Sequence, residues 1–279
     1  MPELPEMQAL SERLHDAVVG ARVERTEQLG FVGLKTVRPA PADLVGVEVA
    51  RVSRRAKYLV VEMETGQRVL IHLAQAGRVD LEQPAKSTKP RGSVVRFVFD
   101  NGVGILVREH GSERKARWWI LAAGDDGPLE ELGPDPSEQS FVEFLMQGSD
   151  ARRLHTMLRD QHSVAGIGRG YADDILHLAR LSPFASLDSL DAARRTDLVS
   201  AISDVLQGAL AQERTREGGL SAARLGDRFQ IHNRAGEPCP RCGVTLSRVS
   251  YAAYEIVYCP HCQTNDKVLA DRRLSRLLR

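Results

Sequence analysis

Four cysteines form two pairs with the same internal spacing, Cys239 with Cys242 and Cys259 with Cys262, and sixteen residues separate the pairs. Each pair places two thiolates on one tight turn, and two such turns supply the four tetrahedral ligands that zinc prefers. The alternatives are four independent buried thiols or two disulfides, and a cytosolic setting disfavours disulfides. The spacing therefore predicts one structural zinc ion per chain, bound by these four residues.

The chain begins with the segment Met1-Pro2-Glu3-Leu4-Pro5-Glu6. Met1 is normally removed before a proline, and we expect this to leave a secondary amine. An α-amine titrates far below a lysine, so a useful fraction of it is unprotonated at neutral pH. Attack of such an amine on a sugar C1′ gives a cationic iminium, an electron sink that facilitates β-elimination, and Glu3 lies beside the amine. The alternative is a helix start punctuated by prolines, with acids near the positive end of the dipole.

The composition is typical of an ordinary soluble globular protein, with 279 residues, 42% of them hydrophobic and 27% charged, and a formal net charge of +1. The charge is uneven, because the segment from residue 229 onward has eight basic residues against four acidic ones. No apolar run approaches the length that spans a bilayer, and the N-terminus lacks the pattern of a secretory signal. We therefore expect a cytoplasmic protein with no membrane partner.

The N-terminal part of the chain predicts a short helix followed by strands. Leu10, Leu14 and Val18 recur at helical spacing, and Gly20 is a plausible end. Runs rich in β-branched residues follow at 45–52, 58–63, 68–74, 93–100 and 103–108, separated by turn residues. Because no long helix is expected between these strands, the sheet should be mostly antiparallel, as a sandwich or flattened barrel.

The pattern changes to helical periodicity after the segment 132–136, which reads LGPDP. Helices are predicted at about 137–147, 152–161, 171–178 and 191–212, and the cysteine segment offers a hairpin from 245–249 and 254–258. The expected fold class is α+β and multidomain. Its predicted parts are an N-terminal antiparallel β-sandwich (1–131), a helical domain (132–228), a zinc finger (229–263) and a basic extension (264–279).

Segments from most of the chain together resemble the formamidopyrimidine-DNA glycosylase / endonuclease VIII family. They are the N-terminal PELPE, the RRAKY at 54–58, the LGPDP at 132–136, the helix-turn-helix segment 158–174, and 229–238 leading into the cysteines. The PELPE form is closer to the formamidopyrimidine branch. The resemblance implies that 158–174 forms a helix-two-turn-helix motif. It also implies a bacterial-type, nucleoid-associated repair enzyme that acts as a monomer on double-stranded DNA with damaged bases or abasic sites.

The resemblance also implies a catalytic set of four residues. Pro2 matches the family's Schiff-base nucleophile, and Glu3 matches the acid that protonates the departing base or the opening sugar. Glu6 matches a supporting carboxylate, and Lys57 a lysine that contacts phosphate and assists proton transfer. An amine, a nearby acid and a cation for the phosphate form a chemically coherent set. The implied activity is that of a bifunctional DNA glycosylase and AP lyase.

The residues expected to contact DNA from this resemblance are Lys57, Gln75, Arg91, Arg114, Arg169, Tyr171 and Tyr254. Three of these positions depart from the family pattern. Gln75 replaces a methionine that fills the space left by the everted nucleotide, which is expected to weaken the flipped state. Arg169 replaces an asparagine that hydrogen-bonds phosphate, and Tyr254 replaces an arginine that clamps the phosphates flanking the lesion and is linked to δ-elimination.

Other departures concern segments rather than single contacts. A phenylalanine that also fills the gap falls near Ala116 in this chain. The segment between Arg214 and Arg228, where the family places a loop over the lesion, is short. The chain continues past its fourth cysteine, and 266–279 is expected to form a helix packed beside the finger with a solvated basic face. An extra phosphate contact is the alternative for this extension.

The sequence leaves three functions open. A bifunctional glycosylase and AP lyase is favoured, because Pro2, Glu3, Glu6 and Lys57 are all retained. A non-catalytic binder of damaged DNA on the same scaffold is the main alternative, since the residues that fill the DNA gap have changed. The third function is that of a zinc-ribbon protein with an incidental N-terminal proline, and the resemblance over nearly the whole chain argues against it.

Overall fold

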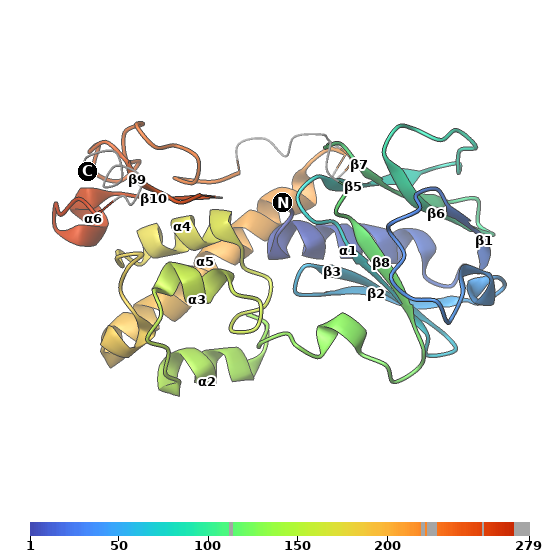
Figure 1. Cartoon of the computed structure of the whole chain (residues 1–279), viewed down its shortest axis with the longest axis horizontal. Helices are drawn as coiled ribbons and strands as arrows, with labels where there is room; N and C mark the ends of the chain where they lie inside the picture. The colour runs from blue at the N-terminus through green and yellow to red at the C-terminus, as the bar shows by residue number, and fades with distance from the viewer. Residues whose placement is uncertain (112–113, 219–220, 222–227, 253, 271–279) are drawn as a thin grey trace. The chain divides into compact units, whose positions relative to one another are not determined.

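The computed structural model describes residues 1–111, 114–218, 221, 228–252 and 254–270. The chain divides into two compact units (Figure 1). The first consists of Met1–Glu131 with Leu210–Gly226, and the second of Leu132–Ala209 with Asp227–Arg279. No helix among the described residues is both long and apolar enough to cross a membrane.

The first unit is a sandwich of two antiparallel four-stranded sheets with a helix, α1 (Leu4–Val18), packed on it. One sheet has the order β1-β6-β7-β5 and the other β2-β3-β4-β8. The bounds are β1 (Val23–Gln28), β2 (Val49–Arg55), β3 (Tyr58–Met63), β4 (Arg68–His72), β5 (Gly77–Glu82), β6 (Ser93–Phe99), β7 (Gly104–Glu109) and β8 (Arg117–Leu121), with short 3-10 helices at Pro41–Leu44 and Gly127–Leu129. The predicted sandwich is confirmed.

One apolar core joins the two sheets and α1, with Leu14 of α1, Leu59 of β3 and Val95 of β6 all fully buried. Trp118 of β8 meets Phe97 of β6 edge-on across the sandwich, with their ring centroids 5.6 Å apart. Burial of these side chains on the inner faces of two sheets is the main stabilising contribution of such a fold.

Strands with charged faces account for the differences between the predicted and observed sheets. β1, β5 and β8 were not predicted, because β1 (VERTEQ) and β5 (GRVDLE) carry charged residues among few apolar ones, and β8 is short. The strand expected at 45–52 begins instead at Val49, since Gly46 takes a φ of 82° in a turn. Strand pairing in the sandwich thus overrides weak local preference.

The second unit contains helices and a small hairpin (Figure 1). Its elements are α2 (Gln139–Gln147), α3 (Leu154–Arg159), α4 (Arg169–Leu178), the 3-10 helix Leu187–Ser189, α5 (Ala192–Thr215), which continues into the first unit, β9 (Ser247–Ser250), β10 (Glu255–Tyr258) and α6 (Pro260–Thr264). The predicted helical region and the antiparallel hairpin are confirmed.

The segment that leads into the finger is tied to α4 by one carboxylate. Asp174 accepts backbone N–H bonds from Gln230 at 2.8 Å, from Ile231 at 2.9 Å and from His232 at 3.4 Å. Burial raises the pKa of Asp174 to about 6, although these three donors oppose the shift. A single buried side chain therefore satisfies several backbone donors at the base of the finger.

The chain after the finger departs from its prediction. α6 ends at Thr264, and both Asn265 and Asp266 have positive φ angles, 49° and 62°. Residues 267–270 are not helical, and the Leu269 N–H donates to the Tyr258 hydroxyl at 2.8 Å. The helix predicted over 266–279 therefore does not begin at its predicted start. The remainder of that prediction, 271–279, lies outside the described residues.

Candidate active site and metal centre

The start of α1 buries two carboxylates beside Pro2. Glu3 is 3% exposed and Glu6 is 1% exposed. The Glu3 backbone N–H donates to Glu6 Oε2 at 2.6 Å, so Glu6 caps the helix by reaching back one turn. Pro5 in the first helical turn costs no hydrogen bond, since its missing N–H has no partner there in any helix. Glu6 thus fixes the backbone at residue 3.

Lys57 lies in a two-residue turn between β2 and β3, in which Arg55 pairs with Tyr58. Ala56 takes a φ of 53°, a conformation that such tight hairpins require and that few side chains tolerate. The Lys57 side chain is largely buried, at 6% exposure.

The β2–β3 turn lies at the Glu3 end of α1, as two contacts between β2 and α1 indicate. Val52 meets the His15 ring, and the Arg54 Nε–H donates to Gln8 Oε1 at 2.9 Å. Moving along β2 therefore means moving back along α1. The turn that carries Lys57 follows Arg54, beyond these contacts, so the fold brings Lys57 toward the buried carboxylates.

Other predicted site residues lie at the same end of the sandwich. One row of the sheet runs Arg55, Tyr58, His72, Arg117 across β2, β3, β4 and β8. Lys57 precedes Tyr58, Gln75 follows His72, and Arg114 precedes Arg117 by three residues. In the second sheet Gly77 pairs with Glu109, and the Glu109 N–H donates to Gly92 O at 2.9 Å. Arg91 directly precedes Gly92 and so lies beside this pair. The strand register therefore places four predicted residues at one edge of the sandwich: Lys57, Gln75, Arg91 and Arg114. We name this edge the basic rim.

Gln75 is exposed at the tip of a turn that only glycine can close. The Gly77 N–H donates to Leu73 O at 2.8 Å, and Ala74 has a φ of 50°. A Cβ at Gly77 would lie 2.2 Å from Leu73 O, which no side chain can meet. The turn therefore presents Gln75 away from the sheet.

The loop that carries Arg114 is organised by one buried carboxylate. Glu109, 4% exposed, accepts from Lys115 N at 2.7 Å and from Ala116 N at 2.8 Å. Arg114 is exposed, and its Nη1 donates to Glu109 O at 3.2 Å. Ala116, where the resemblance places a gap-filling phenylalanine, is a core residue at 5% exposure, whereas Lys115 beside it is exposed. Residues 112–113 of this loop lie outside the described part.

His72, which the sequence reasoning did not assign to the site, adjoins Lys57. Its ring centroid lies 4.9 Å from that of Tyr58. Burial, together with the positive charges of Lys57 and Arg117, lowers the pKa of His72 to about 4. The ring is therefore neutral at physiological pH and adds no repulsion to Lys57. His72 lies three residues before Gln75 in the sequence, but only strand pairing places it beside Lys57.

In the second unit, the turn before α4 is built around Gln161. Its amide donates to Ile167 O at 2.7 Å and accepts from Gly166 N at 2.9 Å. The turn delivers Arg169 as the first residue of α4. A Cβ on Gly170 would lie 2.1 Å from the Phe229 ring, so the helix start can approach that ring only with glycine.

Tyr171 supports this surface from within. Its side chain is 1% exposed, and its ring meets Phe229 edge-on with the centroids 5.1 Å apart. Because the Tyr171 ring is buried, it is not placed to make the expected contact with DNA. Arg169 and Tyr254, expected to contact DNA as well, are half-buried and lie 5.8 Å apart, measured from the guanidinium carbon to the ring centroid.

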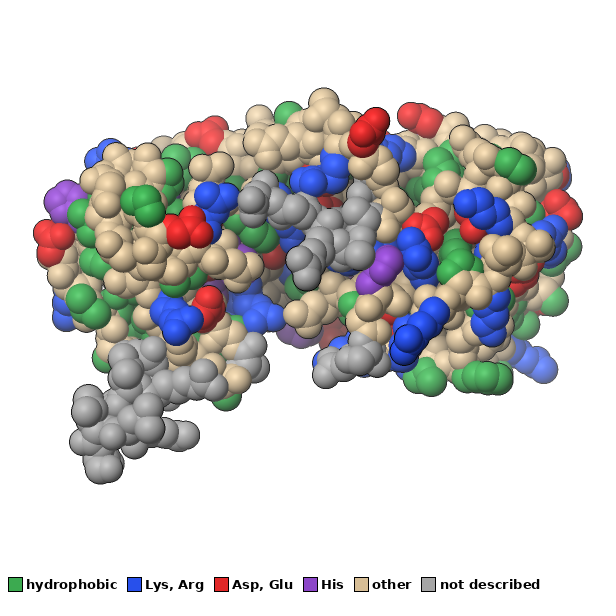
Figure 2. Space-filling model, turned by 90° about the horizontal axis from the view of Figure 1, so that it is seen from above, with side chains coloured by type: hydrophobic (Ala, Val, Ile, Leu, Met, Phe, Trp, Pro, Cys, Tyr) green, Lys and Arg blue, Asp and Glu red, His purple; other side chains and the backbone are tan. Residues whose placement is uncertain are grey.

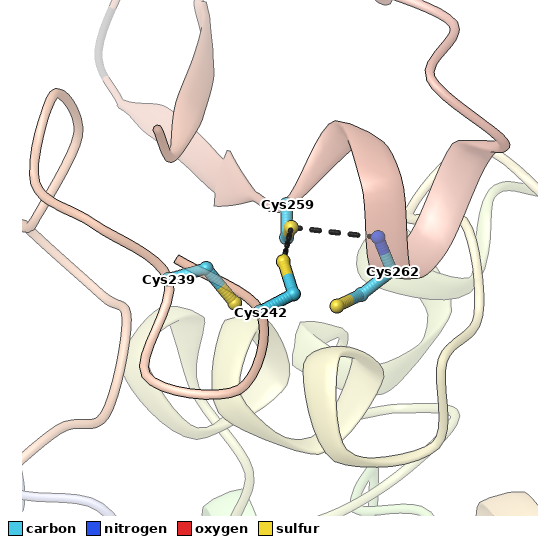
Figure 3. A group of neighbouring side chains, drawn as sticks. All are labelled: Cys239, Cys242, Cys259 and Cys262. Carbon is cyan, nitrogen blue, oxygen red and sulfur yellow. Dashed lines mark hydrogen bonds between the residues drawn. The ribbon is translucent and has the colours of Figure 1, made fainter. Parts of the chain in front are cut away.

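The four cysteines converge in the finger (Figure 3). Their sulfur atoms all lie within 4.8 Å of one another, and Cys242 Sγ and Cys259 Sγ are 3.5 Å apart. Backbone N–H groups donate to two of these sulfurs, Arg241 to Cys239 and Cys262 to Cys259, both at 3.4 Å. Such donors stabilise thiolates, and four thiolates at this separation fit one tetrahedral zinc ion. The predicted structural zinc is confirmed.

A histidine of α4 contacts this centre. His177 Nε2 lies 3.2 Å from Cys239 Sγ, and the residue is 5% exposed. Burial, with a contribution from Arg241, lowers the pKa of His177 to about 4, so the ring is neutral. Arg241, within the first cysteine pair, donates to His177 O at 2.8 Å. The finger is thus joined to α4 next to the metal ligands, a contact that helical periodicity around His177 does not reveal.

On one face of the protein, the basic side chains of the described residues do not form a single continuous field. Figure 2 shows Lys and Arg side chains interspersed with Asp and Glu over the face that it draws. This agrees with the formal net charge of +1. Attraction of a polyanion must therefore come from particular groups such as the basic rim, because the net charge supplies little.

Three family models match the chain in sequence order. Residues 1–112 match the formamidopyrimidine-DNA glycosylase N-terminal domain, and residues 132–218 match its H2TH domain. Residues 236–265 match the zinc finger found in FPG and IleRS.

Full-length relatives and solved structures agree with these matches. A formamidopyrimidine-DNA glycosylase of Roseiflexus sp. is 32% identical and covers 94% of this chain and 100% of its own, and one of Symbiobacterium thermophilum is 34% identical over 94% and 89%. A Mycobacterium tuberculosis formamidopyrimidine-DNA glycosylase-like protein is 41% identical over 53% of this chain and 94% of its own. The fold is similar to that of Lactococcus lactis Fpg in a complex with N7-benzyl-Fapy-dG DNA, with a TM-score of 0.81, 24% identity, and 94% and 100% of the two chains covered.

Proposed function

The chain belongs to the formamidopyrimidine-DNA glycosylase family, and on this premise we propose that it is a bifunctional DNA glycosylase and AP lyase of base excision repair. Its substrate is double-stranded DNA that contains a damaged base or an abasic site, and it acts as a monomer. The observation that carries this proposal is the burial of Glu3 and Glu6 at the start of α1, directly after Pro2. Carboxylates are rarely buried unless a partner or a function holds them there.

The proposed chemistry begins when Met1 has been removed and Pro2 has a free secondary amine. This nitrogen attacks C1′ of the damaged nucleotide, the glycosidic bond breaks, and the base leaves with a proton supplied by Glu3. The nitrogen then loses its proton, the C1′–O4′ bond breaks and O4′ takes up a proton, which leaves an iminium between Pro2 and the opened sugar. Because it is permanently cationic, it draws electrons from C2′, a C2′ proton is lost, and the 3′ C–O bond breaks. Hydrolysis then frees Pro2.

The other residues of the first unit position the DNA for this reaction. Glu6 holds the backbone of residue 3, as its 2.6 Å hydrogen bond supports. Lys57 contacts the phosphate beside the reacting sugar and assists proton transfer. The exposed Gln75 and Arg114 of the basic rim enter the space that the everted nucleotide leaves, and the exposed Arg91 also contacts the DNA.

We propose that the second unit binds the backbone of the duplex. Arg169 at the start of α4 binds a backbone phosphate, with Tyr254 beside it, and the zinc ion holds the finger in shape. The proposed division of the chain is a catalytic sandwich at 1–131, a helix-two-turn-helix domain at 132–228, a finger at 229–263 and an extension at 264–279.

A non-catalytic binder of damaged DNA is the second candidate. Two observations favour it: the polar Gln75 stands at the tip of its turn, and Ala116 lies in the core rather than at the surface. Both changes leave less apolar surface to fill the gap in the duplex. Retention of the buried Glu3 beside Pro2 favours the enzyme, because a binder needs neither.

A panel of duplexes tests the proposal. Each duplex carries one lesion, an oxidised purine, an oxidised pyrimidine, an alkylated base or an abasic site, and is incubated with the purified protein. We expect release of at least one base, together with strand incision at its site. Binding without base release or incision on every duplex would instead support the non-catalytic candidate.

A further inference from the structure

The ring of Tyr254, in the finger hairpin, is held between two other side chains. The Tyr251 ring stacks on it, with the centroids 4.6 Å apart and the planes 13° from parallel. The guanidinium carbon of Arg159 lies 4.1 Å from the Tyr254 centroid. Since two groups at such distances cannot share one face of a ring, Arg159 covers the face opposite Tyr251. A guanidinium on a tyrosine face is a favourable cation–π pair.

Contacts on both sides keep this stack in place. Arg153 Nη1 donates to the Tyr251 hydroxyl at 2.6 Å, and its guanidinium covers the Phe184 ring at 3.8 Å. The His155 ring stacks nearly parallel to the Tyr254 ring, with an angle of 10° between their planes and the centroids 6.2 Å apart. Hairpin and α3 are therefore joined by aromatic contacts between residues about a hundred positions apart in the chain.

Arg159 has no anion of its own within the described residues. None of their carboxylates forms an ion pair with it, and its buried Nε has no hydrogen-bond partner. The nearby acids pair with other basic groups. Asp160 pairs with Arg152 at 2.7 Å, and Asp173 pairs with His155 and His232. The positive charge of Arg159 is therefore not neutralised by any acid of the described residues, and an anion such as a phosphate would complete this site.

A second guanidinium converges on the same ring. Arg169, at the start of α4, has its guanidinium carbon 5.8 Å from the Tyr254 centroid. Two like charges around one ring repel each other, and an anion that touches both removes the repulsion. Guanidinium groups match the geometry of phosphate oxygens and can bind them with two parallel hydrogen bonds.

We propose that Arg159 and Arg169 together bind one phosphodiester of the DNA backbone, and that Tyr254 holds Arg159 in place for this contact. The inference rests on the proposed function, which supplies the DNA. The positive charge then comes from the end of α3, while the finger contributes the aromatic ring that orients it. Arg159 is therefore a DNA-binding residue, and Tyr254 is its positioning residue.

The test compares Arg159→Gln with a matched control that removes the same charge. Arg194→Gln is suitable, because Arg194 is on α5, half-exposed, and 3.7 Å from Asp197. Affinity is measured for a duplex with a tetrahydrofuran abasic-site analogue and for its undamaged counterpart over a salt series. We expect Arg159→Gln to weaken both by about tenfold and to flatten the salt dependence by about one unit. Arg194→Gln should stay close to the wild type.

Further variants separate binding from folding and test the role of Tyr254. Arg159→Lys keeps the charge without the planar group, so its loss should be intermediate. Tyr254→Leu should cost nearly as much as Arg159→Gln, Tyr254→Phe much less, and the double variant of Arg159→Gln with Tyr254→Leu no more than either single one. Zinc content and melting temperature are recorded for each, and we expect Arg159→Gln to keep both.

The outcomes are distinguishable. If the wild type binds both duplexes and Arg159→Gln behaves as Arg194→Gln does, the assignment of Arg159 is overturned while the proposed function stands. Additive losses in the double variant would overturn the positioning role of Tyr254. If the wild type binds neither duplex, the proposed function itself is overturned, and this inference with it.

Discussion

The start of α1 and the contact between α3 and the finger hairpin hold their functional groups in different ways. At the start of α1, Glu6 caps the backbone of Glu3 three residues away, so a short stretch of sequence builds the arrangement. At the hairpin, Arg159 lies on Tyr254 and Arg153 binds Tyr251, pairs that the fold alone brings together. The first region follows the family motif residue by residue, whereas the second departs from it.

This difference follows from what each region has to do. Covalent chemistry requires a particular nitrogen and a particular acid within reach of one carbon, and few residue types provide them. Binding a phosphate requires a positive charge at the right place, which an arginine on a neighbouring element supplies as well as one on the hairpin. We therefore expect substitutions in the first region to affect rate, and those in the second to affect affinity.

The largest effect is expected from Glu3→Gln. The amide keeps the shape of the acid but cannot supply a proton, so the single-turnover rate of base removal should fall by about 10²–10⁴-fold while DNA affinity changes little. Glu12→Gln is the control, because Glu12 lies on the same helix and pairs with Arg214 at 2.7 Å on the surface. A Glu3→Gln protein that excises bases at the wild-type rate would remove Glu3 from the chemistry.

The metal centre provides the next test, because its contact with α4 links the finger to the helices. His177→Phe removes the group 3.2 Å from Cys239 Sγ, and we expect zinc affinity to fall by about 10–100-fold in a chelator competition. The wild type should contain one zinc per chain by metal analysis. His261→Phe, at an exposed histidine between two ligands, is the matched control. Equal zinc affinity in both variants would show that His177 packs against the metal centre without strengthening zinc binding.

A smaller effect is expected from removing one phosphate contact in each of the two units. Lys57→Ala and Arg169→Ala should each weaken binding by about tenfold, to damaged and undamaged duplex alike, and flatten the salt dependence by about one unit. Lys57→Ala should also slow incision at saturating DNA, whereas Arg169→Ala should not, which separates the role of the first unit from that of the second. Salt-dependent binding and single-turnover rates for both variants provide the measurement. Unchanged affinity for both across the salt series would contradict these contacts.

The smallest effect concerns the distribution of products. Because the family resemblance places Tyr254 at the position of the arginine linked to δ-elimination, we expect mainly the β-elimination product with little of the β,δ-product. Gel mobility separates the 3′ unsaturated aldehyde from the 3′ phosphate. A predominantly phosphate-ended product would show that the second elimination does not depend on an arginine at position 254.

Sequence patterns predicted the parts of the molecule that local interactions build. The sandwich, the main helices and the cysteine cluster follow from periodicity and spacing. β1 and β5 were not predicted because their charged residues obscure the alternation typical of a strand. These segments become strands because β1 pairs with β6 and β5 pairs with β7. The contacts of His177 with Cys239 and of Arg159 with Tyr254 were not predicted for another reason. They join residues far apart in sequence, and no local pattern encodes such a pair.

The central claim is that Pro2 forms the covalent intermediate, and borohydride trapping tests it most directly. The mature protein is incubated with abasic-site duplex and borohydride, and the cross-linked peptide is identified by mass spectrometry. We predict that the cross-link maps to Pro2, that Pro2→Gly keeps part of it through a primary amine, and that an N-terminal extension abolishes it. A cross-link on Lys57, or one formed equally well by the extended protein, would contradict the claim.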